Sequence, residues 1–483
     1  MAIMIIEMAA TKKETSSHGL KLVAAGKKAA TTDRRSAADL SFHIETLRCP
    51  KNRVDSRRMR TSLLRLGFRE AEKPEQADFF LINSCSFIRE AQEETIQTVF
   101  NALQVKKEKS PNMKVGLVGC FVERFSQAVS QEIPELDFTI GTQRYHEVGG
   151  LISEQFGIEP AGHAAQLASE IISFGPDTQR PFAWLRIAQG CDRKCAFCII
   201  PKIRGGLKTY TLEDIDRQIA DELALRGGTV PLQEVVLVSQ DTISQGIGEL
   251  EQIIAHLSAR EDIRWIRLQY LFPDRRVLDL LDLWKKYPRL VPYLDIPFQH
   301  VSPEILRRMK RPSDVALFDE IINKAHAITP DFEIRTSFIV GFPGETEAEY
   351  RALVDFTREH RLDKLALFRY SHEAGTSAGD TMDETVSDEE KYRRINELRD
   401  IHLETRKQYA LGLIGRRETM IVDEISGGEI VLRRAHDAPE SDEVVTVPLG
   451  SSPYIKSLTV GSMPVVELKA YAEYSFLGEI VPA

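Results

Sequence analysis

Apolar residues recur along the chain in short runs that alternate with stretches of helical spacing. In the first third, runs at 44–47, 79–82 and 115–118 have the length and composition of buried strands. A helical pattern follows each run. Because strands that alternate with helices build parallel sheets covered by helices, we expect an α/β domain over residues 43–165.

A second series of strand and helix patterns follows a linker at 166–181. Helical patterns such as 212–226 and 347–360 separate six apolar runs. The runs lie at 184–188, 234–239, 263–269, 293–297, 333–340 and 364–370. Six βα units fall short of the closed eight-fold barrel, so we expect a partial (β/α)6 barrel in a domain over 182–411.

The last 72 residues change pattern again, to short β-rich runs separated by Gly and Pro. This pattern predicts a small antiparallel β-barrel over 412–483. At the other end, residues 1–42 are rich in Ala, Ser and Thr without an apolar period, and we expect a disordered tail. The predicted fold class is therefore α/β, with an N-terminal parallel-sheet domain, a central partial barrel and a C-terminal β-barrel.

Composition excludes several classes of protein. A chain of 483 residues with 42% hydrophobic residues can fill two or three cores. Its 63 Lys+Arg and 72 Asp+Glu give a net charge of −9, which argues against a protein that coats nucleic acid. The sequence lacks an apolar run near the 18 or so residues of a membrane span, so we expect a cytoplasmic protein without membrane contact.

Six cysteines are too few for a disulfide scaffold, and they fall into two triplets. Cys49, Cys85 and Cys120 each follow a predicted strand of the first domain. Open parallel sheets gather ligand sites at the carboxyl ends of their strands, so we expect these three thiols to converge. The alternative is that each is a small buried hydrophobic residue.

The second triplet is compact. Cys191, Cys195 and Cys198 lie within eight residues, on the loop after the first barrel strand. Structural zinc and ferredoxin-type clusters take four ligands, so three thiolates predict a metal centre with one open position. A zinc knuckle with a distant fourth ligand is the alternative.

The Cys-x3-Cys-x2-Cys spacing, with Phe197 before the last cysteine, resembles the radical S-adenosylmethionine (SAM) superfamily. The resemblance implies a 4Fe-4S cluster on Cys191, Cys195 and Cys198, with SAM chelating the fourth iron and Phe197 near the adenine. It also implies one-electron cleavage of SAM to a 5'-deoxyadenosyl radical, chemistry that only a cofactor supplies.

Other motifs resemble the methylthiotransferases within that superfamily. CPKNRVDS (49–56), NSCSF (83–87) and LVGC (117–120) are similar to their N-terminal domain, and the last domain is similar to their TRAM module. The resemblance implies a second, auxiliary 4Fe-4S cluster on Cys49, Cys85 and Cys120, which holds or donates sulfur. Arg48 and Gln245 depart from the family pattern, which has Gly and Tyr there.

Further stretches resemble the RimO-type branch more than the tRNA-modifying branch. They are SQDT (239–242), LDIPFQH (294–300), MKRP (309–312) and AHDAPESD (435–442). The tRNA-directed branch has GQN at the first stretch and lacks DAPE. The resemblance implies addition of a methylthio group to the β-carbon of an aspartate in small-subunit ribosomal protein twelve, with an electron donor and a sulfur donor as partners. A tRNA adenosine methylthiotransferase and a non-catalytic iron-sulfur scaffold are the alternatives.

The charge of the last domain favours a protein partner over tRNA. From Arg416 onward there are six basic and eleven acidic residues, a net charge of −5. Phosphate contacts dominate binding of nucleic acids, whereas an acidic module suits a basic protein. We therefore expect Asp437, Glu440 and Asp442 to contact the ribosomal protein.

Polar residues after the barrel strands are candidate contacts of SAM or of the substrate. Gln240 and Asp241 follow the second strand, Gln299 the fourth and Gly341 the fifth, on the face that carries the cysteine loop. A glycine at position 341 lets the backbone approach a cofactor. A turn-capping pair and an ordinary glycine turn are the alternatives. Radical chemistry requires no acid-base pair, so we assign no catalytic side chain.

Basic residues surround the second triplet. Arg193, Lys194, Lys202 and Arg204 are expected to be solvated surface charges. The alternative is that they orient the cofactor carboxylate or an electron donor.

Overall fold

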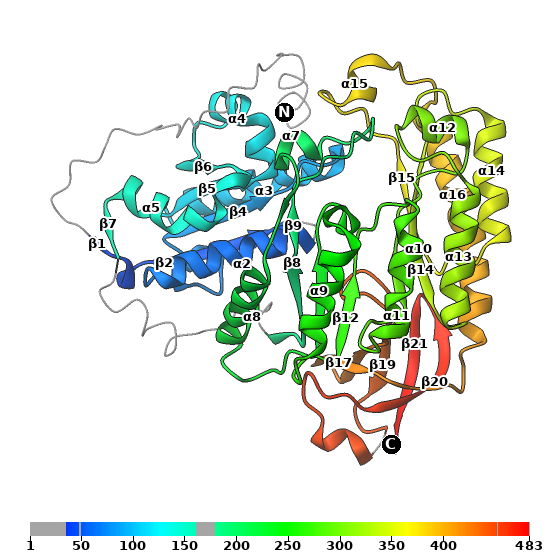
Figure 1. Cartoon of the computed structure of the whole chain (residues 1–483). Coiled ribbons are helices and arrows are strands. Elements are labelled where there is room, and N and C mark those ends of the chain that lie inside the picture. The colour runs from blue at the N-terminus through cyan, green and yellow to red at the C-terminus, as the bar shows by residue number, and fades with distance from the viewer. Residues whose placement is uncertain (1–34, 48–49, 161–178, 452, 483) are drawn as a thin grey trace. The chain divides into compact units, whose positions relative to one another are not determined.

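The computed structural model describes residues 35–47, 50–160, 179–451 and 453–482, and the chain forms two compact units (Figure 1). The N-terminal unit contains the described residues up to 160 together with an inserted segment, Ile199–Gly206. The barrel unit contains the other described residues, from 179 to 198 and from Leu207 onward. Most of the predicted tail, residues 1–34, and most of the predicted linker lie outside the described residues.

A five-stranded parallel sheet with the order β3-β2-β4-β5-β6 forms the centre of the N-terminal unit. The strands are β2 (Ser41–Thr46), β3 (Arg69–Glu70), β4 (Phe79–Ser84), β5 (Lys114–Gly119) and β6 (Phe138–Ile140). The three predicted strands are confirmed as β2, β4 and β5. All six residues of β4 are buried, as a central strand covered on both faces requires.

Helices cover both faces of this sheet. They are α2 (Pro50–Arg65), α3 (Arg89–Glu108), α4 (Cys120–Glu132) and α5 (Val148–Phe156), whereas α7 (Ile200–Arg204) lies against the start of α4. One apolar core joins α3 and α4 to the sheet, and a second joins α2 and α5 to it.

Residues 35–42 belong to this unit, which corrects the predicted end of the tail. β1 (Arg35–Ser36) pairs with β7 (Ile158–Glu159) in parallel, and β2 begins at Ser41. Ala37, Leu40 and Phe42 are buried in the core, so this stretch gains its order from long-range packing that a polar, Ala-rich sequence does not reveal.

Six parallel strands build the barrel unit, as predicted. They are β8 (Phe182–Arg186), β11 (Glu234–Val238), β12 (Trp265–Leu268), β13 (Tyr293–Asp295), β14 (Glu333–Val340) and β15 (Lys364–Arg369). They form two three-stranded ladders, β12-β11-β8 and β13-β14-β15. A single parallel bridge between Ile266 and Leu290 continues the wall from one ladder toward the other.

Helices pack against the outside of these strands around the largest apolar core of the molecule. They are α8 (Leu212–Arg226), α9 (Ile247–Ser258), α10 (Arg276–Leu281), α11 (Leu283–Lys286), α12 (Pro303–Arg308), α13 (Ala316–Ile328), α14 (Glu347–Glu359) and α16 (Asp388–Leu411). The short helix α15 (Ser377–Thr381) belongs to a smaller apolar cluster beside the cysteine loop. Thr346 and Glu349 form a capping box that begins α14. None of the described helices has the length and apolar character that crossing a membrane would require.

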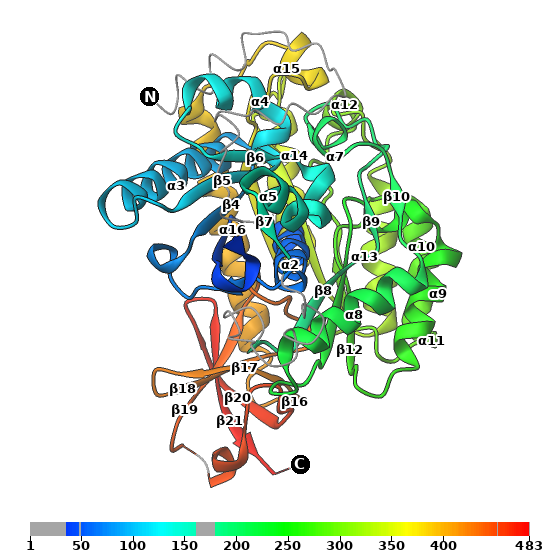
Figure 2. The ribbon, with the colours of Figure 1, turned by 90° about the vertical axis from the view of Figure 1, so that its left-hand side faces the viewer.

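The C-terminal module of the barrel unit is a curled six-stranded sheet, visible at its lower end in Figures 1 and 2. Its strands are β16 (Arg417–Thr419), β17 (Ile421–Ser426), β18 (Glu429–Arg433), β19 (Val444–Pro448), β20 (Val465–Ala472) and β21 (Ser475–Val481). Backbone bonds between Val422 and the 461–462 turn help to close the barrel.

The prediction of an antiparallel barrel is wrong for one pair of strands, since β19 and β21 run in parallel. A long connection, 449–464, separates β19 from β20 in the sequence. A tight hairpin then joins β20 to β21, which pair antiparallel.

Candidate functional site

The second cysteine triplet lies on a loop past the carboxyl end of β8. Gly190 has a φ of 76°, a conformation that favours glycine, and turns the chain into the loop. The N–H of Cys198 donates to the carbonyl of Cys195 at 3.1 Å, which folds the triplet back on itself. The N–H of Ala196 donates to the carbonyl of Met309 at 2.9 Å, so the MKRP stretch anchors the loop.

Two arginines flank the thiols, Arg193 within the loop and Arg311 from the MKRP stretch. The Arg311 Nη1 atom is 3.7 Å from the Cys195 Sγ atom. Both Arg311 and Arg193 stack on the Phe272 ring, with guanidinium-to-centroid distances of 4.3 and 3.9 Å. Burial lowers the pKa of Arg311, and the thiols of Cys195 and Cys198 oppose that shift. This arrangement places a cationic group beside the Cys195 thiol, a contact that the sequence did not predict for Arg311.

Arg193 is not the solvated charge that we expected. Its side chain is 28% exposed and forms ion pairs with Asp241 at 2.8 Å and Asp274 at 2.9 Å. Burial disfavours the charged form of Asp274, but hydrogen bonds from Arg276 and Arg193 lower its pKa below the usual value. The guanidinium is therefore held rigidly beside the cysteine loop.

Four glutamine amides of the barrel unit have buried atoms without a hydrogen-bond partner among the described residues. Both polar atoms of the Gln240 amide are in this state, as are the Nε2 atom of Gln245 and the Oε1 atoms of Gln269 and Gln299. Gln299 also has a φ of 72°, unusual for a residue other than glycine. Buried polar atoms are normally satisfied, so these amides suit a bound polar ligand. Gln269 was not predicted, although it too stands just past a barrel strand.

The other predicted cofactor contacts have local partners. Asp241 caps the turn that follows it, accepting from the N–H of Ile243 at 3.2 Å, as the turn-capping alternative expected. Gly341 has a φ of 73°, and a Cβ there would lie 2.4 Å from the Lys391 Cγ atom. Phe197 packs at the edge of an apolar cluster around the loop. The cofactor roles of these three residues stay predictions.

In the N-terminal unit, Cys85 and Cys120 follow neighbouring parallel strands. Cys85 comes directly after β4 and Cys120 directly after β5, and the last residues of these strands, Ser84 and Gly119, are register partners. The two cysteines therefore occupy equivalent positions at the carboxyl ends of these two strands. Cys49 lies outside the described residues.

Buried hydrogen bonds from the CPKNRVDS and NSCSF motifs hold this edge of the sheet. The Asn52 amide donates to the carbonyls of Leu47 at 2.8 Å and Ser84 at 3.1 Å. The Ser86 hydroxyl donates to the carbonyl of Cys120 at 3.0 Å. The polar residues of the motifs thus position the backbone around these two cysteines.

The residues of the second triplet fit an iron-sulfur cluster, because one short loop carries three thiols and leaves one iron position open. In the N-terminal unit, Cys85 and Cys120 follow neighbouring strands and could supply two thiolates to a second cluster.

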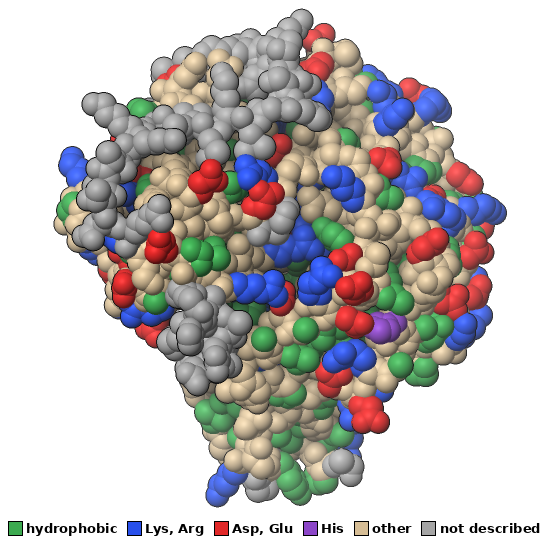
Figure 3. Space-filling view, turned by 60° about the vertical axis from the view of Figure 1, so that its left-hand side comes forward, with side chains coloured by type: hydrophobic (Ala, Val, Ile, Leu, Met, Phe, Trp, Pro, Cys, Tyr) green, Lys and Arg blue, Asp and Glu red, His purple; other side chains and the backbone are tan. Residues whose placement is uncertain are grey.

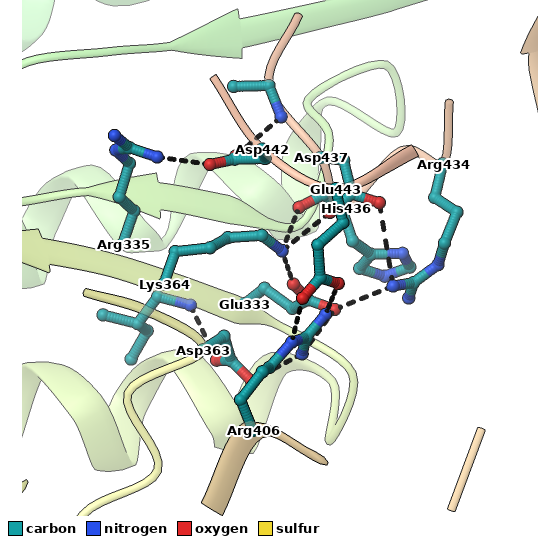
Figure 4. Close-up of polar contacts among 12 residues, drawn as sticks. Glu333, Arg335, Asp363, Lys364, Arg406, Arg434, His436, Asp437, Asp442 and Glu443 are labelled. Atoms are coloured by element: carbon teal, nitrogen blue, oxygen red, sulfur yellow. Dashed lines mark hydrogen bonds and ion pairs between the residues drawn. The ribbon is translucent and has the colours of Figure 1, made fainter. Parts of the chain in front are cut away.

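The AHDAPESD stretch lies inside the barrel unit rather than on an open acidic face. Asp437 is 0% exposed, and its Oδ1 atom is 2.8 Å from the Lys364 Nζ atom (Figure 4). Asp442 pairs with Arg335, and its side chain is 1% exposed. The prediction that these carboxylates contact a ribosomal protein is therefore wrong for Asp437 and Asp442. Glu440 is paired with Arg180.

Other carboxylates of the C-terminal module are also used internally. Asp423 pairs with Arg433 at 2.7 Å, Glu418 with Arg434 at 3.0 Å, and Glu443 with Arg406. On the face shown in Figure 3, acidic side chains are few and scattered over the lower end of the molecule. A count of acidic residues does not distinguish buried ion pairs from surface charge, so the net charge of −5 carries no argument for a basic partner.

Comparison with known proteins identifies the family. Family models match residues 41–141 (Uncharacterized protein family UPF0004), 185–357 (Radical SAM superfamily) and 414–481 (TRAM domain). Ribosomal protein uS12 methylthiotransferase RimO of Leptospira biflexa is 37% identical over 91% of this chain and 96% of its own length. The chain belongs to the RimO family. It is therefore a radical SAM transferase.

A second RimO relative, from a Thermoanaerobacter species, is 34% identical over 90% of this chain and 99% of its own length. Among solved structures, the radical SAM methyltransferase TsrM from Kitasatospora setae aligns with a TM-score of 0.52. The alignment covers 80% of this chain and 79% of TsrM at 11% identity, which supports the fold alone. RimO-family membership thus rests on sequence, and it confirms the resemblance that the motifs indicated.

Proposed function

We propose that this chain adds a methylthio group to the β-carbon of an aspartate in ribosomal protein uS12. The observation that carries the proposal is its match to curated RimO proteins along nine-tenths of its length, at up to 37% identity. Those relatives are named ribosomal protein uS12 methylthiotransferases. Under this proposal an electron donor and a sulfur donor are the further partners, and the site of action is the cytoplasm.

Cys191, Cys195 and Cys198 would hold the radical SAM cluster, with SAM at the open iron position. When bound, this pair supplies a carbon-centred radical, which can remove hydrogen from an unactivated carbon where proton transfer cannot. Arg311 contacts the loop at Cys195, and Arg193, within the loop, stacks on Phe272. The unpartnered amides of Gln240 and Gln299 offer hydrogen bonds to polar groups of SAM or of the substrate.

Cys85 and Cys120, together with Cys49, would hold the auxiliary cluster. The equivalent positions of Cys85 and Cys120 after paired strands support the assignment. Because two clusters carry about eight irons, Cys191→Ala should lower the bound iron by about four, and Cys120→Ala should do so independently. Iron analysis of anaerobically loaded full-length protein measures both losses.

The test of the activity is anaerobic. The loaded chain is incubated with SAM, dithionite and ribosomal protein uS12, and mass spectrometry follows both the small molecules and the protein. A gain of one methylthio group on one aspartate, with 5'-deoxyadenosine formed, is the expected result. Deoxyadenosine with modified tRNA instead of modified protein would favour a tRNA adenosine methylthiotransferase. The absence of both products, from a chain fully loaded with iron, would favour a non-catalytic iron-sulfur scaffold.

A further inference from the structure

The inserted segment, Ile199–Gly206, carries a buried arginine into the N-terminal unit. Arg204, on α7, is 3% exposed rather than solvated as the sequence indicated. Its Nη2 atom is 3.3 Å from the Cys120 Sγ atom, 2.9 Å from Asp55 Oδ2 and 3.1 Å from Asn52 Oδ1. One guanidinium nitrogen thus contacts a sulfur and a carboxylate.

The segment is packed firmly against the cysteine. Ile199, Ile203 and Cys120 form a small apolar cluster, and the Thr142 hydroxyl donates to the carbonyl of Ile203 at 2.9 Å. Asp55 is 0% exposed. Water therefore screens the Arg204 and Asp55 charges little, and each acts on its surroundings more strongly than a surface charge would.

We propose that the Arg204–Asp55 ion pair sets the reduction potential of the auxiliary cluster through Cys120. The inference rests on the proposed auxiliary cluster. A cluster that accepts one electron from an external reductant gains one negative charge. Net charge and hydrogen bonds to sulfur are the protein's main means of tuning that step.

The two members of the pair act in opposite directions. The guanidinium stabilises the reduced cluster and raises its potential, whereas the carboxylate neutralises the guanidinium and lowers it again. Asp55 thus limits how far the Arg204 guanidinium on Cys120 stabilises the reduced auxiliary cluster. Arg204 and Asp55 are positioning residues, since both act through Cys120.

The experiment isolates the auxiliary cluster. Full-length chain carrying Cys191→Ala, Cys195→Ala and Cys198→Ala is loaded with iron and sulfide, and its midpoint potential is measured by stepwise reduction followed by electron paramagnetic resonance. Asp55→Asn should raise the potential and Arg204→Met should lower it. The double variant, which removes both charges, should fall between them, and Arg204→Lys should stay nearer the parent than Arg204→Met.

Two control variants distinguish the effect of a charge beside the cluster from the general effect of removing a buried ion pair on the potential. Arg60 on α2 is 6% exposed and pairs with Glu70 at 2.9 Å in the same unit. Arg60→Met and Glu70→Gln should leave the potential at the parent value.

Three outcomes would overturn the inference. Equal potentials in Asp55→Asn and Arg204→Met, at equal iron content, would show that the pair does not tune the cluster. Shifts in the same direction would indicate a packing effect. A triple-cysteine variant that retains no iron would overturn the auxiliary cluster itself, and with it this part of the proposed function.

Discussion

The imidazole of His402 lies on α16 among cations, and its burial links the stability of the barrel unit to pH. His402 is 8% exposed and lines a cavity of about 350 Å³ together with Lys364 and Arg406. Burial is the main cause that lowers its pKa to about 4, and the positive charges of Arg406 and Lys364 lower it further.

Stability should fall as pH drops from about 6.5 toward 4. In that window the unfolded chain binds a proton at His402 and the folded chain does not, so the loss approaches about 3 kcal/mol over the whole range. When the pH falls from 7.5 to 5, the free energy of unfolding of His402→Gln should decrease by about 2 kcal/mol less than that of the parent. Urea denaturation at the two pH values measures both decreases. The exposed His372→Gln variant is the control, and an unchanged pH dependence in His402→Gln would contradict the prediction.

The junction between β5 and α4 is the element that positions Cys120. Gly119 has a φ of 103°, and a Cβ there would lie 2.7 Å from Asn83 Oδ1 and 3.0 Å from the Ser84 carbonyl oxygen. Both neighbours belong to the buried polar group of residues around Cys85 and Cys120.

Gly119→Ala should therefore displace the start of α4 and destabilise the N-terminal unit by about 2–4 kcal/mol, from a strained backbone plus a buried clash. Bound iron should fall by about four per chain if Cys120 is displaced. Gly157→Ala is a matched control, because Gly157 has a φ of 66° at the end of α5 but open space at its Cβ position. It should cost about 1 kcal/mol and leave the iron content unchanged.

Among the elements, the sequence predicted the strands whose positions follow from a local run of apolar residues. Apolar runs located β2, β4, β5 and the six barrel strands within a few residues. The short pairing of β1 with β7 was missed, because two-residue strands carry no period and depend on partners more than 100 residues away. The burial of Arg204 was missed for the same reason, since its partners Asp55 and Cys120 lie far away in sequence.

At the scale of the barrel unit, ion pairs join the C-terminal module to the amino ends of the barrel strands. Glu333 begins β14 and Lys364 begins β15, and both belong to the network around Asp437 and Arg434 (Figure 4). Glu234 begins β11 and pairs with Arg433 of β18. The module is thus attached at the end of the strands opposite to the cysteine loop.

Asp437→Asn should destabilise this attachment by about 3–5 kcal/mol, because it leaves Lys364 and Arg434 buried with one countercharge fewer. Faster hydrogen exchange in β16–β21, with bound iron unchanged, is the expected signature. Glu440→Gln, in the same stretch, removes a partly exposed partner of Arg180 and should cost at most about 1 kcal/mol. Equal exchange in the two variants would contradict a role for Asp437 in this attachment.

The discontinuous N-terminal unit has a consequence for synthesis on the ribosome. Chains generally fold from the amino terminus as they emerge, one unit at a time. Here Asp55 and Cys120 are synthesised well before Arg204 and Ile203. Until the inserted segment emerges, the nascent unit has a buried carboxylate without its cation and an unfilled apolar site. The N-terminal unit is therefore complete only after Cys191, Cys195 and Cys198, which precede that segment, have also been synthesised.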